Sequence, residues 1–278
     1  MEQVEHKAKP LRLPWKWGVI LVAGLLLLGW LLNTPPGVLG KADAVGYAVC
    51  HRIEARSFHI GDRALPLCAR CSGQYLGAMV GLGFQFAFAR RRTGVPARGM
   101  IAFLILFVLA YAVDGVNSYL HLAPLMEMLP NLPRLYEPNN ILRLATGTGM
   151  GLAVAAALYP AFTSTVFKST DERPALAGWR HLLAMVGLGV LVVLLVLTES
   201  PLVLYPAALV SAAGVLTLLT MVYAIIWMMV FRFENRVERF GQLVMPLVAG
   251  FATGLAQITA FDFVRYWLTH TWGGFPLG

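Results

Sequence analysis

The stretch LVLYPAALVSAAGVLTLLTMVYAIIWMMVF (residues 202–231) contains no charged residue and no histidine. About 20 apolar residues in a helix cross the hydrocarbon core of a bilayer, so this stretch is long enough to span a membrane. A helix also bonds all of its backbone amides internally, which hydrocarbon requires. The stretch therefore predicts a transmembrane α-helix.

Six further stretches share this apolar character. With the first they give seven predicted spans, at residues 17–32, 67–89, 100–122, 141–162, 181–198, 202–231 and 243–267. Hydrophobic residues make up 58% of the chain and charged residues 13%, whereas soluble domains carry about 25% charged residues. The sequence therefore predicts an all-α protein, a polytopic bundle of transmembrane helices in the cell membrane.

Lysine and arginine are distributed unevenly between the connections. Fourteen of the 22 lie in the N-terminal tail and in the second-to-third, fourth-to-fifth and sixth-to-seventh connections. The positive-inside bias then predicts a cytoplasmic N-terminus and an extracytoplasmic C-terminus. Membrane orientation and acidic lipids account for the net charge of +8, so no nucleic-acid partner is expected. Five of the eight opposite basic residues lie within residues 41–70, which indicates a role other than orientation.

The predicted outer loop and the start of the next span carry all three cysteines. Pro66 suits the first turn of that span, which places Cys68 and Cys71 one turn apart on the same face. The positive end of a helix favours thiolates, which are both metal ligands and nucleophiles. With Cys50 and His51 folded back, the four side chains supply a tetrahedral Cys3His site, and zinc is the expected divalent ion.

Other interpretations of the cysteines stay open. Cys50 bonded to Cys68 or Cys71 would form a structural disulfide, which an oxidising compartment favours. A redox-active pair would instead make the protein a thiol–disulfide oxidoreductase, similar to quinone-linked disulfide-forming membrane enzymes. His59 and His121 are alternative fourth ligands for a metal.

The third span carries Asp114, Asn117 and His121 on one helical face. Asp114 lies roughly 12 Å below the outer end of its helix, where a carboxylate is costly unless it is paired. Arg143, at the start of the next span, is the expected partner. Asp262 and Arg265 invite the same interpretation more weakly.

Polar residues from separate segments therefore converge on the outer third of the membrane. Asp114 and Glu137 are candidate catalytic general bases. The candidate substrate-binding residues, suited to an anionic group, are Arg56, Arg70, Asn140 and Arg143. Small residues also recur every four positions and predict close helix contacts: Gly73, Gly77 and Gly81, then Gly147, Gly151 and Ala155, then Gly250 and Gly254.

One part of the sequence resembles a known family. It comprises Cys50-His51, Arg56-Ser57-Phe58, LPLCARCSGQYLG (residues 65–77), Asp114-Gly115, and Glu137, Asn140, Arg143, Thr146 and Gly147. This pattern is similar to the membrane proteins of domain of unknown function 2085 and covers about residues 45–160. The long proline-containing insert before Glu137 departs from it. The resemblance implies that these polar positions act together, and it brings no known activity.

These observations predict three parts of the chain. Residues 1–33 form a cytoplasmic tail and the first span, residues 34–165 a core membrane domain with the outer Cys/His loop, and residues 166–278 a three-span extension. The favoured hypothesis is a metal-dependent membrane enzyme whose extracytoplasmic Cys3His site acts on an anionic, lipid-borne substrate. The alternatives are the oxidoreductase, and a transporter or structural protein braced by an Asp–Arg pair.

Overall fold

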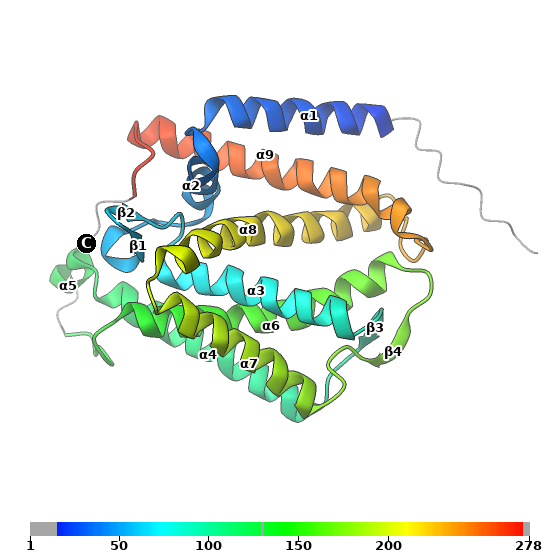
Figure 1. Ribbon diagram of the computed structural model, residues 1–278, viewed down its shortest axis with the longest axis horizontal. Coiled ribbons are helices and arrows are strands. Elements are labelled where there is room, and N and C mark those ends of the chain that lie inside the picture. Colours follow the sequence, from blue (N-terminus) through cyan, green and yellow to red (C-terminus); the bar gives the residue numbers. More distant parts are fainter. Residues whose placement is uncertain (1–15, 129–130, 275–278) are drawn as a thin grey trace, which may run out of the picture.

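The computed structural model describes residues 16–128 and 131–274, and within them long helices account for most of the chain (Figure 1). These are α1 (Lys16–Asn33), α3 (Ala69–Phe88), α4 (Arg98–Leu120), α6 (Asn140–Val166), α7 (Trp179–Val196), α8 (Pro201–Val230) and α9 (Val244–Thr269). They coincide with the seven predicted stretches to within a few residues. The prediction of an all-α helical bundle is confirmed.

Six of the described helices are long and apolar enough to cross a membrane: α1, α4, α6, α7, α8, and α9 together with the short helix before it. The remaining long helix, α3, has 20 residues and packs against α6, α7 and α8. Because glycines and Gln85 lie on its buried faces, its composition is less apolar than that of its neighbours. It stays a predicted seventh span.

Short elements connect the long helices at the two ends of the bundle (Figure 1). One end carries α2 (Gly37–Val49), η1 (Glu54–Arg56), α5 (Ala123–Met128), and β1 (His59–Ile60) paired antiparallel with β2 (Arg63–Ala64). The other end carries η2 (Phe240–Leu243), and β3 (Arg92–Gly94) paired parallel with β4 (Asp171–Pro174).

The connections follow the predicted partition. Those expected outside lie at the end with α2 and α5, and those expected in the cytoplasm lie at the end with β3, β4 and η2 (Figure 1). Lys7, Lys9 and Arg12 of the N-terminal tail lie outside the described residues. Which end faces the cytoplasm stays a prediction, as does the division into three parts.

Helix α2 replaces most of the loop expected after the first span. Its 13 residues are too few to cross a membrane and include Lys41 and Asp43. The apolar pattern of the sequence therefore does not predict this helix. The helix buries Ala44, Val45 and Tyr47 and packs against α8 and α9. It thereby places the residue that follows it, Cys50, next to the start of α3.

The contact between α3 and α6 depends on the predicted glycines. A Cβ atom added at Gly151 would collide with the carbonyl oxygen of Gln74, and one added at Gly147 with that of Arg70. Glycine is required because the two backbones touch here, as small residues allow in lipid. The first turn of α3 is thereby held against α6.

Candidate functional site

The three cysteines meet at one end of the bundle. Cys50 caps the C-terminus of α2, Cys68 caps the N-terminus of α3, and Cys71 lies in the first turn of α3. Their Sγ atoms all lie within 4.8 Å of one another, and all three thiols are free. The predicted position of Cys71 in the first turn is confirmed, whereas Cys68 lies at the N-cap and not within the helix. Pro66 lies outside the helix, because Cys68 has an extended backbone and α3 begins one residue after it.

Buried groups surround this thiol cluster. Cys50 is 5% exposed, and its Sγ accepts hydrogen bonds from the backbone N–H groups of Arg52 and Cys68, each at 3.4 Å. Hydrogen bonding to the Cys68 thiol and burial raise the pKa of Cys50 to about 11. A cation bound between the sulfurs would reverse this preference, because a coordinating thiol loses its proton.

Histidine does not complete the thiol cluster. His51 is exposed and its ring lies edge-on to Tyr119, with 6.1 Å between centroids. His59 lies 3.9 Å from Glu54, and the Nδ1 atom of His121 lies 2.8 Å from the carbonyl oxygen of Asn117. Among the described residues, the group of metal-ligating atoms that lie together comprises the three thiols. A ligand role for His51 stays a prediction.

Asp114 pairs with Arg70, and the expected pair with Arg143 is wrong. The carboxylate is 1% exposed, and its Oδ2 atom accepts hydrogen bonds from Nε of Arg70, at 3.0 Å, and from Nη2. Arg143 instead donates from Nη1 to Oδ1 of Asn140 at 2.9 Å. The glycine contact with α6 holds the Arg70 backbone beside Gly147, and from there its side chain reaches α4. Arg143 folds back along its own first turn.

Three further residues complete the surroundings of Asp114. Tyr136 donates its hydroxyl to Oδ1 at 2.8 Å, and Thr146 donates to Oδ2 at 3.3 Å. Ser118 accepts a hydrogen bond from Arg70 at 2.7 Å. Burial and the bond to Asp114 raise the pKa of Tyr136 to about 12, because both favour the neutral phenol. Helical spacing from Asp114 points to Ser118, whereas no periodic signal points to Tyr136.

Glu137 lies apart from the buried carboxylate. Its side chain is 96% exposed, and it lies 3.9 Å from Nε2 of His121. The segment that carries it is held to α4 by Asn117, which donates to the carbonyl oxygen of Tyr136 at 2.8 Å and accepts from the Leu135 N–H at 2.9 Å. The structure therefore does not bring the two predicted catalytic carboxylates into one cluster.

The predicted anion-binding arginines do come together. Arg56 donates to the carbonyl oxygen of Ser118 at 3.0 Å, and Arg70 bonds to the hydroxyl of that serine. The positive charges of Arg56 and Arg70 also repel that of Arg143. Burial and the neighbouring Arg70 lower the pKa of Arg56. Three guanidinium groups thus lie near one another while the buried carboxylate of Asp114 pairs with Arg70 alone of the three, an environment that favours a further anion.

Asn140 borders the arginine cluster, which comprises Arg56, Arg70 and Arg143. Arg143 is 7% exposed, and its Nε atom has no hydrogen-bond partner among the described residues. Asn140 lies at the N-terminus of α6, and its amide nitrogen is 3.5 Å from the carbonyl oxygen of Ala55. The charge of Cys68 also acts on Arg56 and Arg143, so the arginine cluster and the thiol cluster are electrostatic neighbours.

Known proteins are similar in sequence to this part of the chain. The family described as predicted membrane protein DUF2085 matches residues 50–157. An uncharacterized protein of Methanothermobacter thermautotrophicus is 31% identical over 108 residues, which are 38% of this chain and 82% of that protein. The chain belongs to the DUF2085 family. An uncharacterized protein of Methanocaldococcus jannaschii is 30% identical over 127 residues, 45% of this chain and 70% of that protein. No solved structure matches.

The DUF2085 region encloses the site. It begins at Cys50 and contains the other two cysteines, the arginine cluster, Asp114, and the glycine contact between α3 and α6. Helices α1, α2, α7, α8 and α9 lie outside the matched residues. The resemblance recognised from the sequence is confirmed as family membership.

Proposed function

We propose that this DUF2085 protein is a membrane metalloenzyme in which Cys50, Cys68 and Cys71 hold a divalent ion, zinc above all, beside a site for an anionic, lipid-borne substrate. The observation that carries the proposal is the meeting of three Sγ atoms within 4.8 Å of one another from segments 18 residues apart. Sulfurs in a tetrahedral zinc site lie about 3.8 Å apart, as Zn–S bonds of about 2.3 Å require. Small side-chain rotations therefore suffice to bind the ion.

Three protein ligands leave a fourth coordination position. Catalytic zinc sites keep this position for water or substrate, whereas structural sites fill it with a protein side chain. The ion would polarise the bound anionic group or activate a water molecule. We assign the fourth position to water or substrate, and His51 is the side chain that would close it.

The arginine cluster supplies the anion site. Arg56, Arg70 and Arg143 present more positive charge than Asp114 balances, and the buried Nε atom of Arg143, which has no hydrogen-bond partner among the described residues, is a further donor for a ligand. Guanidinium groups bind phosphate and carboxylate in bidentate fashion. The site lies at one end of a bundle of helices that are long and apolar enough to span a membrane, and this position supports a lipid headgroup as the anion that we propose.

We assign Asp114 a positioning role. Both of its carboxylate oxygens accept hydrogen bonds, from Arg70, Thr146 and Tyr136, so neither is free to take a proton from substrate. Glu137, whose side chain is exposed, is the better placed of the two carboxylates for proton transfer at the surface of the site.

Metal content tests the proposal directly. Protein purified in detergent without chelator should carry about one divalent ion per chain by elemental mass spectrometry. Cys68→Ser and Cys71→Ser should remove the ion and Cys50→Ser should weaken its retention, while His59→Ala, in the same loop, is the matched control. Retention in His51→Ala supports an open fourth position, and loss makes His51 the fourth ligand.

Thiol counting separates the alternatives. Metal-free protein with a stoichiometric disulfide contradicts the metalloenzyme and supports a thiol–disulfide oxidoreductase or an inert bridge. Metal-free protein with three reduced thiols supports the transporter or structural role.

Lipid binding tests the anion site. By native mass spectrometry, the protein should retain phosphatidic acid over diacylglycerol with the same chains. Arg143→Gln should remove this preference without changing metal content, because it deletes the unpaired donor. Arg63→Gln is the matched control, since Arg63 lies at the same end of the bundle but pairs with Asp43. Equal retention of the two lipids by the unaltered protein would contradict an anionic substrate.

A further inference from the structure

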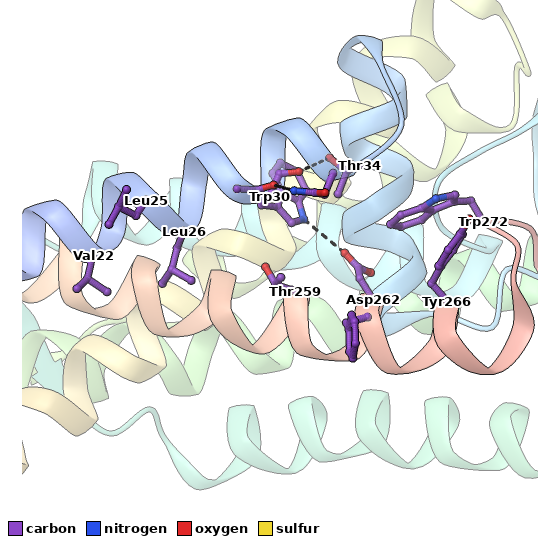
Figure 2. A pocket seen from close by; sticks show the side chains of 12 residues that line it. Val22, Leu25, Leu26, Trp30, Thr34, Thr259, Asp262, Tyr266 and Trp272 are labelled. Atoms are coloured by element: carbon purple, nitrogen blue, oxygen red, sulfur yellow. Dashed lines mark hydrogen bonds between the residues drawn. The ribbon is translucent and has the colours of Figure 1, made fainter.

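A cavity of about 720 Å³ lies between α1 and α9, outside the DUF2085 region (Figure 2). Its walls are mainly apolar: Val22, Leu25, Leu26, Gly29, Trp30, Phe263, Tyr266 and Trp272 line it, together with Asn33, Thr34, Thr259 and Asp262. Its volume falls in the range of small-molecule binding pockets. Neither the thiol cluster nor the arginine cluster lines it.

An incompletely bonded carboxyl group lies in the wall of this cavity. Asp262 is 4% exposed and projects from α9 toward Trp30 of α1, whose Nε1 donates to Oδ2 at 3.4 Å (Figure 2). The Oδ1 atom has no hydrogen-bond partner among the described residues. A buried polar atom without a partner is unfavourable, so a ligand that bonds to Oδ1 would gain affinity.

The charges of Asp262 and Arg265 attract each other, as the sequence led us to expect, but Oδ1 of Asp262 has no hydrogen-bond partner among the described residues. The guanidinium of Arg265 donates to backbone carbonyl oxygens, including that of Cys50 at 2.7 Å. Arg265 thereby anchors the segment after α2, and Asp262 remains turned toward the cavity. A carboxyl group so deep in an apolar wall marks a functional position by default.

The other polar groups narrow the chemistry of the ligand. Thr34 and Thr259 donate their hydroxyl protons to carbonyl oxygens of their own helices, so each offers an oxygen to the cavity. The ammonium group of Lys41 donates to the hydroxyl of Thr34, a residue of the cavity wall, at 2.8 Å, and its positive charge disfavours a second cation. Asp262 disfavours an anion. An uncharged hydroxyl suits the site, because it donates to a carboxylate and accepts from a carboxylic acid.

The cavity faces the region that lipid occupies. Leu25 is 60% exposed and Val22 is 54% exposed on α1, a helix apolar enough to span a membrane. An apolar tail placed along these residues would continue into the acyl chains. At the other end of the cavity, the rings of Tyr266 and Trp272 lie 5.4 Å apart and flank the polar groups.

We propose that this cavity binds a membrane alcohol, an uncharged amphiphile whose hydroxyl head bonds to Asp262 and whose apolar tail lies along α1. The proposal does not depend on the metal centre. The polar part of the wall favours an uncharged head over a charged one, and the lipid-facing apolar part favours a ligand with an apolar tail.

Photolabelling in phosphatidylcholine nanodiscs tests the proposal. Three probes share a hexadecyl chain with a mid-chain diazirine and differ in the head: hydroxyl, trimethylammonium or carboxylate. The alcohol probe should label α1 and α9 saturably, unlabelled hexadecanol should compete, and the charged probes should label at least about tenfold less, equivalent to 1.4 kcal/mol.

Two pairs of variants locate the binding site. Gly29→Leu should abolish labelling because its side chain fills the cavity, whereas Gly24→Leu on the same helix should not, and an added Cβ meets nothing within 4 Å at either position. Asp262→Leu should abolish labelling, and Asp262→Asn should preserve it because an amide still bonds to a hydroxyl. Loss in Asp262→Asn with preference for the ammonium probe would overturn the assignment in favour of a cation site. If all three probes label the protein and Gly29→Leu does not change this labelling, the proposal that the cavity is a binding site is refuted.

Discussion

Asp114→Asn should destabilise the protein strongly, because it removes the carboxylate that balances Arg70 in a buried setting. Asp114 is 1% exposed and the Arg70 side chain 12%, so water screens the pair little. Removing one member of a buried pair costs about 3–5 kcal/mol. For a chain of this size that corresponds to a fall of roughly 6–20 °C in the midpoint of thermal unfolding. The assay is tryptophan fluorescence of the detergent-solubilised protein during heating.

A double-mutant cycle identifies the partner of Asp114. Asp114→Asn with Arg70→Gln should recover most of the lost stability, since both members of the pair are then neutral. Asp114→Asn with Arg143→Gln should recover less, because Arg143 bonds to Asn140 and not to the carboxylate. A silent Asp114→Asn variant, or equal recovery by both double variants, would refute the pairing.

Further measurements address the packing, the metal and the orientation. Gly151→Leu should destabilise by about 1–3 kcal/mol or more, because its side chain meets the α3 backbone, whereas Gly187→Leu, with open space at its Cβ, should not. Bound metal should be released as pH falls, since protons compete for the thiolates, and a zinc-sensitive dye measures the release; release that does not depend on pH would contradict thiolate ligation. Cysteines introduced at Thr93 and Ser169 should react with a membrane-impermeant maleimide only after permeabilisation, and one at Asn131 should react in intact cells. The opposite labelling pattern would reverse the orientation.

The sequence predicted the features that depend on one helix or on one helix face. Apolar length gave the long helices, because a bilayer imposes that length on each span. The spacing of Cys68 and Cys71 placed both at the start of α3, and glycines four residues apart marked the contact between α3 and α6. Each of these inferences needs only the periodicity of a helix.

Features that depend on packing between segments were harder to predict from the sequence. Arg70 and Arg143 each lie in a first turn at the same end of the bundle, and the packing of α3, α4 and α6 brings Arg70 and not Arg143 into contact with Asp114. Helix α2 was not predicted, because it is too short for a span and contains charged residues. Tyr136 reaches the carboxylate from a segment without periodicity, so no pattern points to it.

Arg70 connects the two halves of the candidate site. It lies in the chain between Cys68 and Cys71, its carbonyl oxygen packs against Gly147 of α6, and its guanidinium is held by Asp114 of α4. Two neighbouring helices therefore fix the one turn that presents two of the three thiols. Ligand constellations bind metal well when they are held within about 0.5 Å of the productive geometry. The same pairing directs part of the Arg70 charge toward Asp114, so in the proposed function Arg56 and Arg143 would be the donors to an anion. Under that proposal, thiol geometry and anion recognition would both depend on a single ion pair between α3 and α4.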